Sequence, residues 1–304
     1  MTAQVQKLTI GRILLWLLMI IILFVTLFPF WWVLRTALTT QGQIFNNTSS
    51  LLPVGFTWDN FARVLGLISN KDALEAGGSG QSINFFGFLL NSFVFSTTIT
   101  VAQVSFSTMA AYAFARLRFP GRDFIFLLYV SALMVPGIVT LIPNFVLVRN
   151  LLQFFEIGDT YAGQMGAMVA PYFFMTPFAV FFLRQFFLGI NRELEEAARI
   201  DGAGYFRTFW SVVLPLSRPP IVTLGIITFI NAWNDYLWPF IVGRDESVRV
   251  LTVALNIFRS QQPDGAPDWT GLMAGTALAI IPVLIIYMFV GRQVIDSIQF
   301  TGFK

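Results

Sequence analysis

The 304-residue sequence contains neither cysteine nor histidine. The first absence excludes disulfides and thiolate metal sites, and the second excludes imidazole ligands and every catalytic triad that needs histidine. The sequence also has no Gly-Lys-Ser/Thr motif, which excludes ATP binding through a P-loop. We therefore expect no catalytic residues, no metal site and no cofactor bound by this chain.

Charged residues are also scarce in this sequence. Only 12% of the residues are charged, whereas 56% are hydrophobic and 34 are phenylalanine. So few charges cannot cover a soluble surface, and the composition indicates a polytopic membrane protein in contact with lipid. The net charge of +3 is small, and no basic run with interleaved aromatics is present, so we expect no nucleic-acid partner.

Six long runs with little or no charge predict an all-α protein with six transmembrane helices, because about 20 residues cross a hydrocarbon core. The first run is Ile13–Leu34, and the transmembrane segment assigned to it is 13–35. The other spans are 82–115, 124–148, 160–183, 219–242 and 270–291. The first run is long and lacks an Ala-x-Ala exit, which favours a retained span over a cleaved signal peptide. Residues 36–83 are expected to form an extracytoplasmic loop with a short amphipathic helix from Thr57–Asp59 to Leu67.

The basic residues predict the orientation. Six spans place residues 1–12 and the tail 292–304 on one side. That side holds twelve of the nineteen Lys and Arg residues, namely Lys7, Arg12, Arg116, Arg118, Arg122, Arg184, Arg192, Arg199, Arg207, Arg218, Arg292 and Lys304. The bias predicts cytoplasmic termini.

The most polar long segment runs from Glu195 to Pro220, between the fourth and fifth spans. Its Glu-Glu-Ala-Ala start favours helix, Gly202 and Gly204 permit a bend, and prolines end the segment before the next span. We expect a helix, a glycine turn and a second helix in a cytoplasmic loop (190–218). Small alanines would let another protein approach closely, and the carboxylates of Glu196 and Asp201 could pair with its arginine or lysine side chains. A generic amphipathic surface helix is the alternative.

Glu196-Ala197-Ala198, followed after three residues by Gly202 and after nine more by Val212-Val213-Leu214-Pro215, resembles the EAA loop of bacterial ABC importer permeases. The family pattern has Ile where this sequence has Val212. The string from Glu196 to Ala203 and the string AAYAFARLRFPGR at 110–122 are similar to the carbohydrate-uptake, maltose-transporter-like branch, and the resemblance covers nearly the whole chain.

The resemblance implies a type I ABC importer permease fold in the cytoplasmic (inner) membrane of a bacterium or archaeon, with a permease core at 84–291. It implies a second, unlike permease subunit, two ATPase subunits that carry ATP and Mg²⁺, and an extracytoplasmic solute-binding protein. The loop from Glu195 to Pro215 would be the coupling helix through which ATPase closure drives alternating access. The residues expected to couple are Glu195, Glu196, Ala197, Ala198, Asp201, Gly202, Ala203, Leu214 and Pro215.

Polar residues inside the spans are candidates for a solute path, because such groups are costly in lipid. The candidates are Asn91, Asn231, Asn234 and Asp235. The last three lie in NAWNDYLWP, which resembles a Trp-Asn-acidic segment of sugar-importer permeases. Carboxamides and aromatic rings suit sugar hydroxyls and ring faces, but the Asp235 stretch could equally be an interfacial anchor. Pro136-Gly137 and Pro143 in the third span are either a packing kink or a cavity wall.

Three functions are alternatives for this sequence. The first is a permease for a sugar or oligosaccharide, and the second is the same machinery importing a polyol glycoside or a glycerol phosphodiester. The third is an intramembrane enzyme or channel, which is disfavoured because no two acids lie at matching depth in different spans. The sequence does not name the solute.

Overall fold

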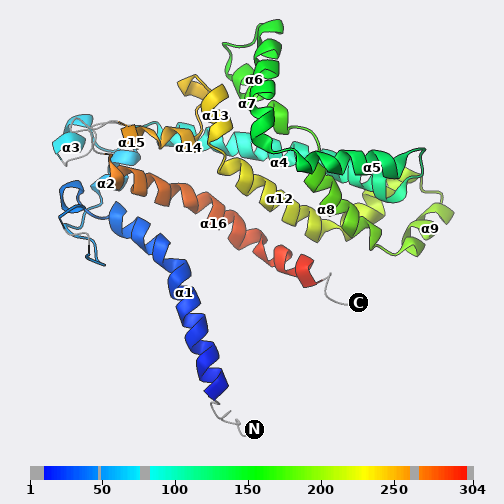
Figure 1. Cartoon of the computed structure of the whole chain (residues 1–304), viewed down its shortest axis with the longest axis horizontal. Coiled ribbons are helices and arrows are strands. Elements are labelled where there is room, and N and C mark those ends of the chain that lie inside the picture. Colours follow the sequence, from blue (N-terminus) through cyan, green and yellow to red (C-terminus); the bar gives the residue numbers. More distant parts are fainter. Residues whose placement is uncertain (1–9, 47–48, 76–82, 261–266, 300–304) are drawn as a thin grey trace. The chain divides into compact units, whose positions relative to one another are not determined.

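The computed structural model describes residues 10–46, 49–75, 83–260 and 267–299, and every regular element in these ranges is a helix (Figure 1). Four helices are long and apolar enough to cross a membrane: α1 (Ile10–Ala37), α4 (Phe85–Arg116), α6 (Gly137–Phe154) and α16 (Trp269–Gln299). Two pairs of shorter helical segments are also apolar enough if each bent pair is counted as one span, which brings the number of candidate spans to six. These pairs are Tyr161–Tyr172 with Pro177–Leu188, and Tyr205–Leu216 with Arg218–Trp233. The expected all-α membrane architecture is confirmed.

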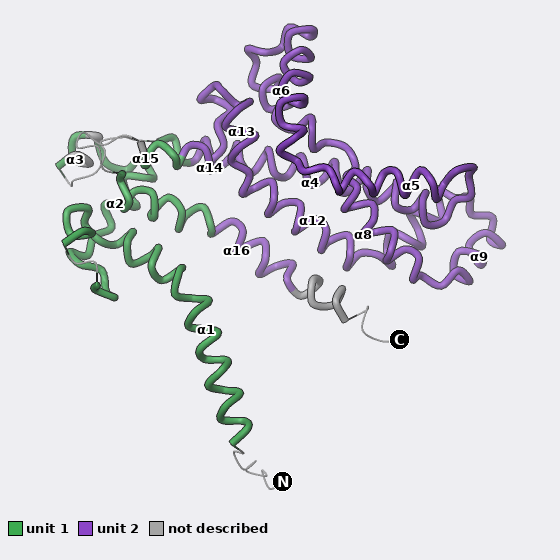
Figure 2. Tube along the Cα trace, viewed as in Figure 1, with its two compact units in different colours: residues 1–85, 255–280 green, residues 86–254, 281–304 purple. Residues whose placement is uncertain are grey.

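The chain divides into two compact units, coloured separately in Figure 2. Unit 1 comprises residues 1–85 and 255–280, and unit 2 comprises residues 86–254 and 281–304. The sequence suggested a single core at 84–291, whereas the structure groups residues 255–280 with the N-terminal part. The terminal residues 1–9 and 300–304, which belong to the expected N-terminus and tail, lie outside the described residues.

Unit 1 contains α1, the 3₁₀ turn η1 (Gln41–Gln43), α2 (Asp59–Val64), α3 (Asn70–Glu75), α15 (Ile257–Ser260) and the first part of α16. A buried ion pair joins two of these helices, since Arg63 Nη1 in α2 lies 2.7 Å from Asp268 Oδ2 at the start of α16. The expected amphipathic helix is α2, which ends at Val64 rather than Leu67 because Gly66 adopts a φ of +71°. The apolar side chains of α1 are exposed from Ile10 to Phe30, as expected of a helix that faces lipid or another subunit.

Unit 2 contains all the remaining helices. These are α4, α5 (Arg122–Ser131), η2 (Ala132–Met134), α6, α7 (Tyr161–Val169), η3 (Ala170–Tyr172), α8 (Pro177–Leu188), α9 (Arg192–Ile200), α10 (Tyr205–Thr208), the π turn η4 (Phe209–Val213), α11 (Leu214–Leu216), α12 (Arg218–Trp233), α13 (Leu237–Val242), η5 (Glu246–Val248), α14 (Leu251–Ala254) and the end of α16. Helix α8 contacts both α5 and α12. A buried cluster fills the space between α4, α8, η4 and α12.

Three expected spans are broken into shorter helices. The third consists of α5 and α6, separated by extended residues at Val135 and Pro136. The fourth consists of α7–η3 and α8, bent by 55°, and α8 begins at Pro177. The fifth is α12 followed by α13, with Asn234–Tyr236 between them. Prolines at or near these breaks remove the N–H group that a continuous helix needs.

Several boundaries differ from the sequence expectation. Helix α16 was expected to end at Gly291 but continues to Gln299, because the charges that end a hydrophobic run do not break a helix. Helix α6 extends to Phe154, into the expected outer loop 149–159. The expected loop 243–269 holds η5, α14 and α15, which are too short to produce a periodic pattern.

Candidate functional site

The polar segment between the fourth and fifth spans folds as a helix, a turn and a second helix. Asn191 caps α9, since its side-chain oxygen accepts a hydrogen bond from the Glu193 N–H at 3.1 Å. Gly202 follows α9 with a φ of +84°, a conformation that favours glycine. Across the turn, the Arg199 guanidinium lies 4.8 Å from the centre of the Tyr205 ring in α10. The expected helix–turn–helix is therefore present.

The solvent-exposed surface of this segment carries most of the predicted coupling residues. Glu196, Ala197, Asp201 and Gly202 are exposed, and Ala198 and Ala203 are half-buried. The carboxylates and small side chains therefore lie together on an accessible surface of α9 and its turn. Such a surface suits close contact with another protein.

Glu195 was predicted beside Glu196 as a coupling residue, but its side chain points inward. It is buried, with 4% exposure, and its Oε1 lies 2.7 Å from Nε of Arg116 at the end of α4. Arg116 Nη2 also donates a hydrogen bond to the Ile190 carbonyl oxygen at 2.7 Å. Glu195 therefore attaches α9 to the spanning helix α4.

The C-terminal part of this polar segment also packs against the spanning helices. Phe209 and Val213 in η4 are buried, and the Phe209 ring lies 5.0 Å from the Tyr112 ring of α4. Leu214 packs against the same cluster, whereas Pro215 is exposed. The segment 205–216 then meets α12 at an angle of 78°. A push on α9 would therefore reach α4 and α12 through packed side chains.

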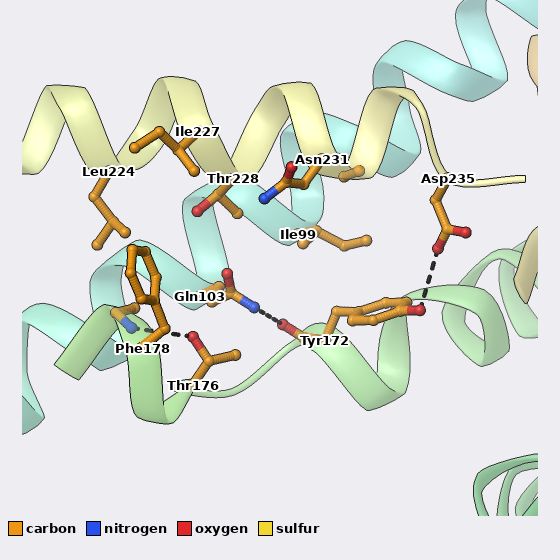
Figure 3. Close-up of a pocket in the computed structure, with 12 residues that line it drawn as sticks. Ile99, Gln103, Tyr172, Thr176, Phe178, Leu224, Ile227, Thr228, Asn231 and Asp235 are labelled. Carbon is orange, nitrogen blue, oxygen red and sulfur yellow. Dashed lines mark hydrogen bonds between the residues drawn. The ribbon is translucent and has the colours of Figure 1, made fainter. Parts of the chain in front are cut away.

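A cavity of about 600 Å³ lies between α4, the break before α8, and α12 (Figure 3). Apolar side chains form most of its wall, and polar groups are spaced along it. The lining residues are Ile99, Gln103, Tyr172, Thr176, Phe178, Ala179, Leu224, Ile227, Thr228, Asn231, Ala232 and Asp235. Mixed apolar and polar walls of this kind are typical of sites for small molecules.

Two hydrogen bonds hold the polar wall in place, as Figure 3 shows. The Tyr172 hydroxyl donates to Asp235 Oδ2 at 3.1 Å, and Gln103 Nε2 donates to the Tyr172 carbonyl oxygen at 3.2 Å. Asp235 lies in the break after α12, where its own carbonyl oxygen accepts from the Thr252 hydroxyl at 2.8 Å. The breaks in the fourth and fifth spans thus bring Tyr172 and Asp235 together.

The structure separates the four predicted path residues into two groups. Asn231 and Asp235 line the cavity. Asn234 is exposed outside it, with its amide bonded to the Ile230 carbonyl oxygen at 2.9 Å. Asn91 is buried, and its amide donates to the carbonyl oxygens of Ser247 and Arg249.

Sequence reasoning missed Arg116, Gln103 and Tyr172 as parts of the site. Gln103 is a polar residue within an uncharged span, and Tyr172 follows Pro171 at a helix break, so both carried a detectable pattern. Arg116 was interpreted only as an orientation marker. Among the residues that the structure describes, no group of three or more acidic residues is placed to hold a metal ion.

Several known proteins are similar to this chain in sequence. Residues 103–298 match the model of the family described as binding-protein-dependent transport system inner membrane component. The chain is 34% identical over 277 residues to the sn-glycerol-3-phosphate transport system permease protein UgpE of Yersinia pestis bv. Antiqua, which covers 91% of this chain and 92% of that protein. It is 33% identical over 297 residues to the arabinooligosaccharides transport system permease protein AraQ of Halalkalibacterium halodurans, covering 96% and 97%.

A solved structure has the same fold. It is a chain of a bacterial ABC transporter involved in the import of the acidic polysaccharide alginate, with a TM-score of 0.73. The two chains are 22% identical, and the match covers 93% of this chain and 96% of that one.

Proposed function

Because this chain belongs to the family of binding-protein-dependent transport system inner membrane components, we propose that it forms half of the membrane path of an ATP-driven importer for a sugar or oligosaccharide. It is a transport protein of the bacterial inner membrane and not an enzyme. ATP and Mg²⁺ would bind to separate ATPase subunits. A solute-binding protein would deliver the solute, and a second, unlike permease subunit would complete the path.

The observation that carries the coupling role is the surface of α9. Glu196 and Ala197 are exposed there, while Glu195 on the same helix is buried against Arg116. One face of α9 is thus available to a partner, and the other is fixed to α4. Closure of the ATPase subunits would push on the exposed face, and the packed face would transmit the motion to the spans as a rigid body. This function requires α9, and with it both termini, to be cytoplasmic, in agreement with the distribution of basic residues.

The cavity supports a neutral polyhydroxyl solute. Asp235 is the one charged residue among the described residues that line it, and Gln103, Tyr172 and Asn231 offer donors and acceptors for hydroxyl groups. A phosphate-bearing solute such as a glycerol phosphodiester would need cationic groups that this wall does not supply. A polyol glycoside, which is also neutral, remains the second candidate. A thermal-shift screen of the binding protein against sugars, polyol glycosides and glycerol phosphodiesters would identify the class.

The coupling role is tested by Glu196→Lys in the purified four-subunit transporter. We expect loss of solute-stimulated ATP hydrolysis, while the binding protein captures solute with unchanged affinity. Glu193→Lys is the matched control, because Glu193 is also exposed on α9 and lies outside the Glu-Ala-Ala sequence. Equal stimulation in the Glu196→Lys transporter and the unmodified one would contradict the proposal.

A further inference from the structure

A second polar feature of unit 2 lies beside α9 and is not explained by coupling. Two hollows, of about 260 and 520 Å³, adjoin the α4–α5 turn and the start of α9. Arg118, Arg122 and Arg192 line both hollows. We refer to these three residues and the two hollows as the arginine cleft. It lies at the end of the unit where Figure 1 shows α9.

The arginine cleft has more positive than negative charge. Arg122 pairs with Asp123 at 3.0 Å, and the buried carboxylate of Glu195 is already paired with Arg116. Within the described part of the chain, no ion pair or side-chain hydrogen bond engages the guanidinium groups of Arg118 and Arg192. Both residues are exposed, so two guanidinium groups are free to bind an anion together.

The larger hollow is also bordered by apolar surface. Phe119 and Phe124 are among its lining residues, and Phe124 is 70% exposed. Leu127 and Leu128 continue this exposed apolar surface along α5, with 68% and 63% exposure. An exposed apolar helix face in a membrane protein faces lipid, and aromatic residues beside it are typical of the headgroup level. The free arginines therefore lie beside a surface suited to lipid, as expected of residues at the headgroup level.

We propose that the arginine cleft binds the phosphate of an anionic phospholipid headgroup, with the acyl chains along the exposed face of α5. Guanidinium groups bind phosphate oxygens through paired hydrogen bonds, and basic pockets on the cytoplasmic side of membrane helices suit such headgroups. A bound headgroup would join the α4–α5 turn to the start of α9 and so hold the coupling segment at the membrane surface. The inference rests on the membrane-spanning part of the proposed function and is independent of the solute.

An acidic surface of an ATPase subunit is the competing occupant. The lipid is favoured because the larger hollow opens beside Phe119 and Phe124, and this exposed apolar surface continues along α5 through Leu127 and Leu128, as acyl chains below a bound phosphate require. The exposed carboxylate of Glu196, which also lines the smaller hollow, is the residue placed toward the ATPase.

The test uses native mass spectrometry of the complete transporter, titrated with phosphatidylglycerol or phosphatidylcholine. The variant is the double substitution Arg118→Gln/Arg192→Gln. The matched control is Arg207→Gln/Arg218→Gln, which removes two exposed arginines that do not line the cleft. A parallel titration adds inorganic phosphate as a soluble competitor.

We expect the unmodified transporter to retain phosphatidylglycerol in preference to phosphatidylcholine. The cleft variant should bind phosphatidylglycerol roughly 25-fold more weakly, a factor of about five for each arginine, while the control binds normally. Equal retention of phosphatidylglycerol by the cleft variant and the control would overturn the proposal. Full displacement of the lipid by inorganic phosphate would overturn the proposal in favour of a site for a free anion. Loss of the ATPase subunits from the cleft variant would overturn it in favour of a contact with a protein.

These outcomes are distinct from those of the coupling experiment. Lipid retention is measured without ATP hydrolysis, so a failure of Glu196→Lys to uncouple the transporter leaves the lipid result unaffected. Conversely, loss of lipid binding in the cleft variant leaves the Glu196 surface intact.

Discussion

Arg116 and Glu195 form a buried ion pair that fixes α9 to the membrane-spanning helix α4, with 2.7 Å between Nε and Oε1. Their side chains are only 3% and 5% exposed. The pair joins the end of α4 to the middle of α9, which are far apart in the sequence. Because Arg116 also binds the Ile190 carbonyl oxygen, α4 holds both α9 and the turn before it.

Replacing Arg116 with methionine should therefore leave Glu195 buried without a partner. Breaking a buried pair on one side costs about 3–5 kcal/mol, whereas replacing both partners with apolar residues is often neutral. We expect Arg116→Met to lower the melting temperature of the purified transporter and to reduce solute-stimulated ATP hydrolysis. The double variant Arg116→Met/Glu195→Met should recover most of the stability. Melting temperatures that are equal in the single and double variants would show that the pair does not hold α9.

The turn after α9 offers a matched pair of glycines. Gly202 has a φ of +84°, Gly204 has a φ of −71°, and neither has an atom within 4 Å of an added Cβ. Gly202→Ser should cost about 1–2 kcal/mol, because a side chain disfavours the left-handed conformation, and should weaken ATPase stimulation. Gly204→Ser should be tolerated, since serine is favoured at the N-cap position that Gly204 occupies before α10. Thermal melting and ATPase assays on both variants measure the difference, and equal effects would refute the conformational explanation.

The cavity predicts a separate effect on solute movement. Tyr172→Phe removes the hydrogen bond that spans the two helix breaks, and Asp235→Asn weakens it by replacing the carboxylate acceptor with a neutral amide oxygen. We expect transport into proteoliposomes to fall by roughly tenfold, the equivalent of one hydrogen bond to a charged group. Asn234→Ala is the control, because Asn234 lies outside the cavity and its amide donates a hydrogen bond to a carbonyl oxygen of its own helix. If Asp235→Asn transports as well as Asn234→Ala, Asp235 is an interfacial anchor and not part of the path.

Much of the architecture follows from composition and local pattern. The hydrophobic runs identified the spanning regions, because the thickness of the hydrocarbon core sets their length irrespective of packing. The helix–turn–helix after residue 195 was predictable because helix propensity, glycine and proline act within a few residues. The interruption of the third span at Pro136-Gly137 was predictable for the same reason, since proline disrupts a helix locally.

The site was less predictable, and Glu195 illustrates why. Adjacent residues on a helix point in directions about 100° apart, so Glu195 is buried and Glu196 is exposed despite their identical chemistry. Which of the two is buried depends on where α4 ends. Asn91 and Asn231 show the same limit, since both are carboxamides within spans, yet one ties α4 to a loop and the other lines a cavity.

The sequence by itself determined a helical membrane protein with a polar helix–turn–helix between its fourth and fifth spans, because hydrophobic length and turn residues are local properties. Only the tertiary structure decided that Glu195 faces Arg116, that Tyr172 meets Asp235, and that Arg118 and Arg192 line one cleft. These relationships depend on the bends between helices and on the packing of segments distant in sequence, which local propensities do not specify.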